Sequence, residues 1–286
     1  MSRALSWWRL SVVGIASLVL GIATFVHADH HEKKDGSAAA LQAIITGSHR
    51  AEADKARDKY RHPLETLSFF GVKDNMTVVE VWPGRGGWYS DILAPFLKER
   101  GTYYAAGFDP EASVEGLRDA AKSYKEKLAG NTALFGSVKE TILSSPTLVD
   151  IAPEGSADLV LTFRNVHNWM ANDQAATVFK AMYKALKPGG VLGVVEHRGN
   201  PTVPQDPKAA SGYVREDTVI KLAEDAGFKL AGKSEINANP KDTKDYPQGV
   251  WTLPPVLRLK DVDKEKYLAI GESDRMTLKF VKPAVK

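Results

Sequence analysis

The chain has 286 residues, of which 43% are hydrophobic and 26% are charged, values typical of a globular protein. Its formal net charge of +3 gives no sign of the strongly basic surface that nucleic-acid binding needs, so we expect no nucleic-acid partner. The sequence holds no cysteine, which excludes disulfides, thiolate metal sites and a cysteine nucleophile.

Residues 1–28 have the pattern of an export signal. Two arginines precede an apolar run, and the run ends in a cleavage-site tripeptide that closes with Ala28. We therefore predict an exported, periplasmic protein that makes no membrane contact after cleavage, with retention as an inner-membrane anchor as the alternative. Residues 29–40 would form a polar linker, in which His30 and His31 either bind a metal or belong to a solvated tail.

A helical pattern covers residues 41–72 and is divided by Pro63. Just before this proline, Tyr60, Arg61 and His62 form a dense polar and aromatic cluster. These three residues either pack on the surface or form a lid over a ligand, so they are candidate substrate or lid residues.

A β-branched apolar run over residues 77–81 predicts the first buried strand. The run contains the carboxylate of Glu80 and leads into a glycine-rich loop with Gly84 and Gly86, after which a helix is expected over 88–97. In an open α/β sheet, nucleotide-like ligands bind at such a strand-to-helix loop. The glycines let the backbone approach the ligand, and the first helical N–H groups face an anion or carboxylate.

Asp109 follows the second expected strand, residues 102–108. Its distance from the glycine-rich loop is close to the ~20 residues after which a carboxylate takes ribose hydroxyls. A third short strand is expected over 132–135, which would place Ser137 at its tip, where an adenine edge lies.

The strand expected over 157–163 is apolar throughout, as burial on both faces demands. Asn165 and His167 follow it. A helix over 175–186 would end in the Lys-Pro-Gly-Gly turn of residues 187–190.

The fifth strand, residues 191–195, is followed by His197. A further helix is expected over 216–226, shortly after Tyr213, and two last strands over 228–236 and 276–281. Residues 237–266 are too polar and rich in proline to be expected in the core.

Taken together, these features resemble the class I S-adenosylmethionine-dependent methyltransferases, and most of all a group of exported bacterial predicted methyltransferases whose loop reads Trp-Pro-Gly. The carriers are the acid and glycine loop of 80–87, Asp109, the strand that begins at Asp158, the Leu-Lys-Pro-Gly-Gly of 186–190 and the final strand pair. The resemblance covers residues 60–282.

The resemblance implies one domain over residues 41–286, with an N-terminal helical cap at 41–72 and an α/β core at 73–286. It implies a Rossmann-like fold whose seven-stranded, mostly parallel sheet ends with an antiparallel strand. S-adenosylmethionine would be the cofactor, and no metal is implied.

The resemblance also assigns roles to residues of the loops. Glu80 would bind the methionine ammonium directly or through water, the backbone at Gly84 and Gly86 would approach the cofactor, Asp109 would hold the ribose, Ser137 would lie near adenine, and Asn165 would lie beneath the sulfonium. Trp82 stands where the family has its first glycine, so we expect the turn to lack its usual freedom of φ. The Trp82 indole either packs in the core or walls the ligand.

Methyl transfer from a sulfonium is an in-line displacement, so positioning is the main task and a base is needed only if the acceptor loses a proton. His167 and His197 are the candidate catalytic bases, with His167 preferred because the tip of the fourth strand lies closest to the methyl group in this fold. For each, the alternative is a structural hydrogen bond to a loop. Tyr213 is a further candidate for the substrate cleft.

The acceptor is expected to be a small molecule methylated on oxygen or nitrogen. The fourth strand leads into Phe-Arg-Asn-Val rather than the Asn/Asp-Pro-Pro-aromatic tetrad that cradles a nucleobase amino group, and covalent pyrimidine methylation requires a cysteine. One alternative is a non-catalytic protein of the same fold that binds S-adenosylmethionine or a similar ligand, since this cofactor is made in the cytoplasm. A nicotinamide-dependent dehydrogenase is disfavoured by the Lys-Pro-Gly-Gly turn and the final strand pair. The oligomeric state is left open.

Overall fold

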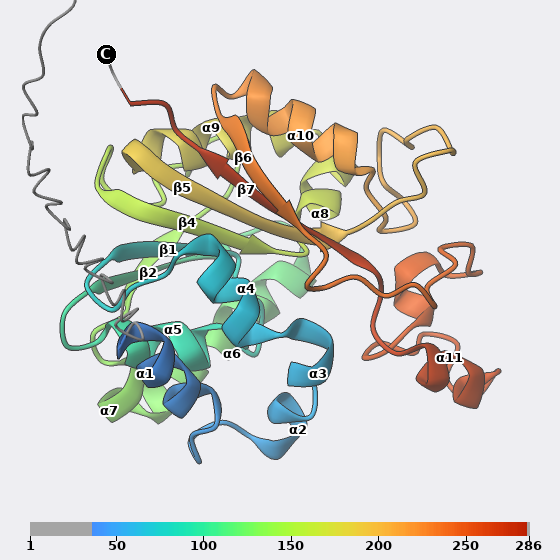
Figure 1. Cartoon of the computed structure of the whole chain (residues 1–286), viewed down its shortest axis with the longest axis horizontal. Helices are drawn as coiled ribbons and strands as arrows, with labels where there is room; N and C mark the ends of the chain where they lie inside the picture. The colour runs from blue at the N-terminus through green and yellow to red at the C-terminus, as the bar shows by residue number, and fades with distance from the viewer. Residues whose placement is uncertain (1–35, 285–286) are drawn as a thin grey trace, which may run out of the picture. The chain divides into compact units, whose positions relative to one another are not determined.

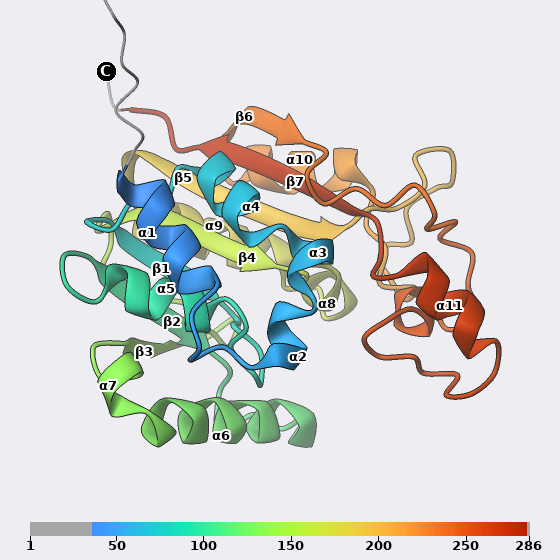
Figure 2. The ribbon, with the colours of Figure 1, turned by 60° about the horizontal axis from the view of Figure 1, so that its bottom comes forward.

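The computed structural model describes residues 36–284 (Figures 1 and 2). The expected signal peptide and most of the expected linker, with His30 and His31, lie outside the described residues. Helix α1 (Gly36–Ile45) begins within the last part of that linker. None of the helices between residues 36 and 284 has the length and apolar character needed to cross a bilayer.

One seven-stranded sheet organises the domain. Its strands are β1 (Thr77–Val81), β2 (Thr102–Gly107), β3 (Lys139–Ile142), β4 (Ala157–Phe163), β5 (Leu186–His197), β6 (Lys229–Ser234) and β7 (Arg275–Val281). Their spatial order is β3-β2-β1-β4-β5-β7-β6. The pairs from β3 to β5 are parallel, whereas β7 runs antiparallel to both β5 and β6. The expected insertion of an antiparallel strand is therefore confirmed, and it removes the dehydrogenase alternative.

Helices cover both faces of the sheet because side chains alternate along each strand. In β1, Val78 belongs to the hydrophobic cluster on one face, and Val79 and Val81 belong to the cluster on the other. The first cluster includes side chains of α1, α4 (Pro63–Phe70), α5 (Ser90–Leu97), α6 (Glu115–Gly130) and α7 (Thr132–Phe135). The second includes side chains of α8 (Val166–Ala171), α9 (Ala175–Ala185) and α10 (Glu216–Asp225).

The strand expected over residues 132–135 is wrong, because these residues form helix α7. Asn131 starts this helix by accepting a hydrogen bond from the Leu134 amide at 3.1 Å, a typical N-cap. The true third strand, β3, is a short edge strand with largely exposed side chains, so its apolar signal is weak. Ser137 precedes β3 and lies at the opposite end of the strand from the carboxyl edge. The prediction that Ser137 lies at the tip of the third strand, on which its place near adenine depended, is therefore also wrong.

The Lys-Pro-Gly-Gly sequence is part of β5 rather than a turn before it. The Gly189 amide donates to the Lys282 carbonyl at 2.8 Å, and the Lys282 amide donates to the Gly190 carbonyl at 2.9 Å, which extends the pairing with the chain after β7. Lys187 also forms an ion pair with Asp158 at 2.6 Å. This sequence therefore ties the start of β5 to both of its neighbours.

The segment of residues 237–266 was expected to stay outside the core, and this expectation is wrong. Leu253 and Thr252 are fully buried, and Asp242 is nearly so. The polar groups can be buried because they find partners: Asp242 accepts hydrogen bonds from the Tyr213 hydroxyl at 2.9 Å and from the Asp274 amide at 2.8 Å. The segment contains the 3₁₀ helix η1 (Gly249–Thr252) and leads into helix α11 (Lys264–Ile270).

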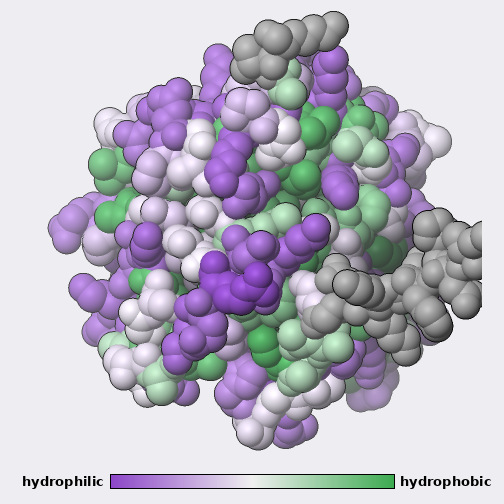
Figure 3. Space-filling model, turned by 60° about the vertical axis from the view of Figure 1, so that its left-hand side comes forward, coloured by the Kyte–Doolittle hydropathy of each residue, from purple (hydrophilic) through white to green (hydrophobic). Residues whose placement is uncertain are grey.

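This segment and two short N-terminal helices, α2 (Glu52–Lys55) and α3 (Asp58–Arg61), lie toward the end of the sheet where β4 and β5 finish (Figures 1 and 2). On the face viewed in Figure 3, hydrophilic and hydrophobic residues are interspersed, as on an ordinary water-exposed surface. Ligands of open α/β sheets bind at the carboxyl ends of the strands, so a functional site is expected at this edge.

Candidate functional site

A cavity of about 750 Å³ opens at the carboxyl ends of β1, β2 and β3. Its walls include Trp82 and Gly84 after β1, Asp109 after β2, and Leu143 after β3. At this edge β1 has β2 on one side and β4 on the other, so the strand order reverses there. Ligands of open α/β sheets bind at such a switch point, and the volume lies within the range of small-molecule sites.

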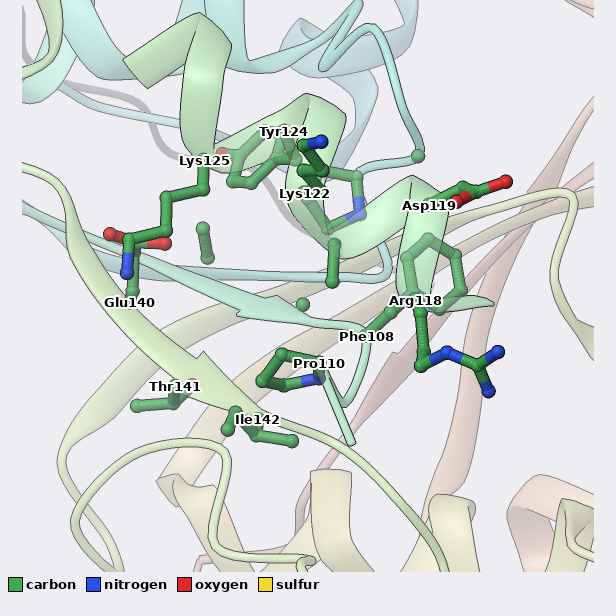
Figure 4. Close-up of a pocket in the computed structure, with 15 residues that line it drawn as sticks. Phe108, Pro110, Arg118, Asp119, Lys122, Tyr124, Lys125, Glu140, Thr141 and Ile142 are labelled. Carbon is green, nitrogen blue, oxygen red and sulfur yellow. The ribbon is translucent and has the colours of Figure 1, made fainter. Parts of the chain in front are cut away.

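A second cavity of about 540 Å³ lies between α6 and the strands β2 and β3. Figure 4 shows Tyr124 on α6 above Thr141 and Ile142 on β3. Gly84 and Phe108 line both cavities, so the two spaces meet at the glycine-rich loop.

Trp82 adopts a left-handed backbone conformation, with φ of 51°. We did not expect this conformation, because it favours glycine. This conformation costs a non-glycine residue roughly 1–2 kcal/mol. Several contacts hold it: the Trp82 amide donates to the Ala106 carbonyl at 2.8 Å, the indole Nε1 donates to the Leu143 carbonyl at 3.0 Å, and the ring packs against Phe108. The indole thus both packs against the core and lines the cavity, which combines the two expected alternatives.

Gly84 and Gly86 leave space that a side chain would fill. A Cβ atom built on either glycine meets no other atom within 4 Å, and Gly84 has φ of 78°. The loop can therefore present bare backbone to a ligand, as the resemblance implies.

Asn165 acts on the same loop from β4. Its Nδ2 donates to the carbonyls of Val81 at 3.0 Å and Trp82 at 3.3 Å, and to the Thr162 hydroxyl at 3.1 Å. Asn165 therefore holds the ends of β1 and β4 together and positions the glycine-rich loop.

Glu80 is buried beneath this loop and faces α5. Its Oε2 accepts hydrogen bonds from the Tyr103 hydroxyl at 2.5 Å and the Ser90 hydroxyl at 3.3 Å. Alternation along β1 explains this direction, because Glu80 lies on the same face as Val78. Burial raises the pKa of Glu80 to about 7, although Tyr103 and Ser90 oppose the shift. Glu80 does not line the 750 Å³ cavity.

Asp109 lies where the sequence predicts it, at the tip of β2 in the wall of the cavity. Its Oδ1 accepts a hydrogen bond from the Glu111 amide at 2.9 Å, which fixes the carboxylate at the start of the loop.

The two candidate bases lie close together at the ends of β4 and β5, with ring centroids 5.3 Å apart. His167 Nδ1 lies 3.0 Å from Glu196 Oε1. In the neutral imidazole with its proton on Nδ1, this contact is a hydrogen bond donated to the carboxylate, and Nε2 is then an acceptor. Glu196 thus orients the His167 ring.

His197 is buried, and its Nδ1 lies 2.6 Å from the Ser273 hydroxyl. Burial lowers the pKa of His197 well below its ordinary value, and His167 and nearby arginines lower it further. His197 is therefore neutral at physiological pH.

Ligand atoms of His167, Glu196 and His197 lie within 4.8 Å of one another, a spacing that would allow a shared metal ion. Glu196, however, also accepts hydrogen bonds from the backbone amides of His197 at 2.7 Å and His167 at 3.3 Å. The arginines that lower the pKa of His197 would also oppose a bound cation. The arrangement therefore favours a carboxylate-oriented base over a metal centre.

The expected lid residues are tied to the segment before β7. Arg61 is buried, stacks over the Trp88 ring at 4.7 Å, and contacts Glu272 at 3.3 Å. The Tyr60 carbonyl accepts a hydrogen bond from Arg275, and His62 turns the chain between α3 and α4 with φ of 39°. The Tyr213 ring lies next to the His197 ring, with ring centroids 6.4 Å apart.

Sequence reasoning missed Glu272, which forms ion pairs with several arginines of this region. Its carboxylate pairs with Arg57 at 2.6 Å, with Arg61, and with Arg275. Burial alone would raise the pKa of Glu272, but Arg275, Arg61, Arg57 and Arg164 outweigh it and hold the pKa well below its usual range. The Glu-Ser-Asp-Arg sequence of 272–275, with three charged residues in four, was the available signal.

No protein-family model and no curated protein sequence matches the chain. Solved structures do match. The fold is similar to a SAM dependent methyltransferase from Aquifex aeolicus, with a TM-score of 0.53, 16% sequence identity, and coverage of 86% of this chain and 98% of that chain. It is also similar to the [4+2]-cyclase SpnF, with a TM-score of 0.50, 15% identity, and coverage of 84% and 86%.

This is the Rossmann-like methyltransferase fold. At such low identities the likeness establishes the fold alone, and one of the two similar proteins is named a cyclase. The reaction must therefore be argued from the side chains of the site.

Replacing Glu272 should destabilise the protein. We expect Glu272→Gln to lower the free energy of unfolding near pH 7 by about 3–5 kcal/mol, because buried arginines lose their counter-charge. Since the pKa of Glu272 is depressed, its stabilisation is present above the ordinary carboxyl pKa and is lost on acidification, so the difference should shrink below about pH 4. Urea unfolding measures both effects. Glu265→Gln, at an exposed position on α11, is the matched control, and equal loss in both variants would contradict the prediction.

Replacing Glu80 should have the opposite effect at high pH. Because its pKa is raised from 4.5 to about 7, the folded protein keeps a proton that the unfolded chain releases, and stability falls as the pH rises through this window. We expect Glu80→Gln to exceed the wild type in unfolding free energy by about 3 kcal/mol at pH 8 and to lose this advantage near pH 4. A pH-independent difference in urea unfolding would show that Glu80 ionises normally.

Proposed function

We propose that the protein is an S-adenosylmethionine-dependent methyltransferase that acts on a small-molecule oxygen or nitrogen acceptor. The observation that carries this proposal is the cavity at the switch point of a methyltransferase fold, bounded by the glycine-rich loop and by Asp109. Export through the predicted signal peptide remains part of the proposal and requires a supply of the cofactor outside the cytoplasm.

The residues of the cavity fit this cofactor. The Asp109 carboxylate can accept hydrogen bonds from both ribose hydroxyls, and the bare backbone at Gly84 leaves room for the methionine portion. Trp82 would form a flat apolar wall at the ends of β2 and β3. Glu80, buried below the loop, would reach the ammonium through water. When bound, the cofactor supplies the activated methyl group.

The chain's own residues would position the acceptor and remove its proton. His167 Nε2 is free to accept a proton because Glu196 holds the proton on Nδ1. Glu196 is a positioning residue that also stabilises the imidazolium formed. Asn165 keeps the glycine-rich loop in register with β4, and so keeps the cofactor aligned with this base.

Calorimetry with S-adenosylmethionine tests the cofactor assignment. We expect saturable binding to the purified protein, and Asp109→Ala should weaken it by about 1–3 kcal/mol, because buried hydroxyls lose their acceptor. Asp261→Ala, an exposed position, is the control and should bind as the wild type does. Absence of binding at millimolar cofactor would overturn the proposed function, and unchanged affinity in Asp109→Ala would exclude contact with the ribose. Binding without turnover on any acceptor would favour the non-catalytic alternative.

A screen of small phenols and amines for release of S-adenosylhomocysteine tests the base. On an acceptor that must lose a proton, His167→Gln should lower kcat by about 10²–10⁴-fold while the affinity for the cofactor stays constant. The control is His49→Gln, since His49 is exposed and its Nε2 lies 2.9 Å from the Asp91 carbonyl. An unchanged kcat in His167→Gln would exclude His167 as the base.

A further inference from the structure

Arg164, the first residue after β4, holds a strained backbone conformation with φ of 62°. Its amide donates to the Val195 carbonyl at 2.7 Å, which fixes the residue between the ends of β4 and β5. Such strain in a bulky residue persists only where the surroundings enforce it, and it gathers at functional sites. Among residues 36–284, the Arg164 guanidinium has no hydrogen-bond or ion-pair partner, although the side chain is only partly exposed.

Three guanidinium-bearing residues lie at this edge of the sheet. Arg61 and Arg275 both contact the Glu272 carboxylate. Arg164 follows β4 at the same edge, one strand away from Arg275, because β5 pairs with β4 through Val195 and with β7 through His197. Burial lowers the pKa of Arg61 well below its ordinary value, and Arg164 is the next contributor. Burial likewise lowers the pKa of Arg164 to about 10, with Arg275 as the next contributor. Each of these residues thus feels the positive charge of a neighbour, and they come from three separate elements, α3, the end of β4, and β7.

Ion pairs among residues 36–284 neutralise only part of this positive charge, although the buried Glu80 carboxyl also interacts with Arg164. Arg57, Arg61 and Arg275 share the single carboxylate of Glu272, and Arg164 is the fourth positive charge near it. A buried charge without a partner is costly, so the region is ready to accept an anion from outside the chain. Guanidinium groups bind carboxylates and phosphates through paired N–H donors.

The arginines do not line the cavity proposed for the cofactor, and this indicates which ligand supplies the anion. The walls of that cavity come from the loops after β1, β2 and β3 and from residues 168, 172 and 174 in and after α8, whereas the arginines belong to α3, the end of β4, and β7. Arg164 stands three residues before His167, in the turn from β4 to α8. An anionic group held by the arginines would thus belong to the molecule whose proton His167 removes.

We propose that Arg164, supported by Arg61 and Arg275, binds an anionic group of the methyl acceptor, a carboxylate or a phosphate. The assignment to the acceptor rests on the proposed function, whereas the anion site itself does not. The acceptor is then a small acid that carries its anionic group beside the oxygen or nitrogen to be methylated.

Titration with inorganic phosphate at constant ionic strength tests the anion site in the protein without cofactor. We expect saturable binding by calorimetry to the wild type, and Arg164→Gln should weaken it by about 10–100-fold. Arg164→Lys, which keeps the charge, should recover most of the affinity, and this rescue separates loss of the charge from loss of the fold. Arg100→Gln is the matched control, since Arg100 is exposed and forms an ion pair with Asp74 away from this cluster. Absence of saturable binding, or equal affinity in Arg164→Gln and wild type, overturns the proposal.

The same titration in saturating S-adenosylhomocysteine identifies the source of the anion. Unchanged phosphate affinity assigns the site to the acceptor. A fall of about tenfold or more means that the amino-acid carboxylate of the cofactor occupies the arginines, which overturns the acceptor assignment. If S-adenosylhomocysteine does not bind at all, the proposed function fails, and with it the acceptor assignment, while phosphate binding by the free protein still establishes the anion site.

Discussion

The ion pairs of the Glu272 carboxylate hold the N-terminal helices against the start of β7. It joins Arg57 and Arg61 from the N-terminal helices to Arg275 at the start of β7, residues more than two hundred positions apart. Without Glu272, the buried guanidinium groups of Arg61 and Arg275 would lack a counter-charge, and their repulsion would destabilise the contact between the helical cap and the sheet. Four arginines lie near this one carboxylate, so Glu272 neutralises only part of their charge. Positive charge therefore remains on Arg164 at the end of β4.

Two of the strained backbone positions lie at the carboxyl edge of the sheet. Trp82 after β1 and Arg164 after β4 both adopt left-handed conformations, and these two strands are neighbours. Asn165 links them by donating to the carbonyls of Val81 and Trp82. The switch point therefore contains two neighbouring strained turns. One turn lines the 750 Å³ cavity, and the other lies beside the arginines and histidines at the ends of β4 and β5.

Long apolar strands and strongly periodic helices could be predicted from the sequence, because each carries its own pattern of burial. The strand of 157–163 is one example, and Asp109 was placed correctly because it directly follows such a strand. The edge strand β3 could not be predicted, since half-exposed strands lack an apolar signal, and the error moved Ser137 to the wrong end of the sheet. Glu80 was predicted at the right position, but the partners of its side chain were not.

The sequence by itself therefore determined the strands other than β3, the glycine-rich loop and the acid at the second strand tip, because these follow from local periodicity and backbone freedom. Only the tertiary structure decided that Glu80 pairs with Tyr103, that Glu196 orients His167, and that four arginines gather around Glu272. These pairs join residues distant in the chain. Their chemistry depends on burial and on neighbouring charge, which no local pattern specifies.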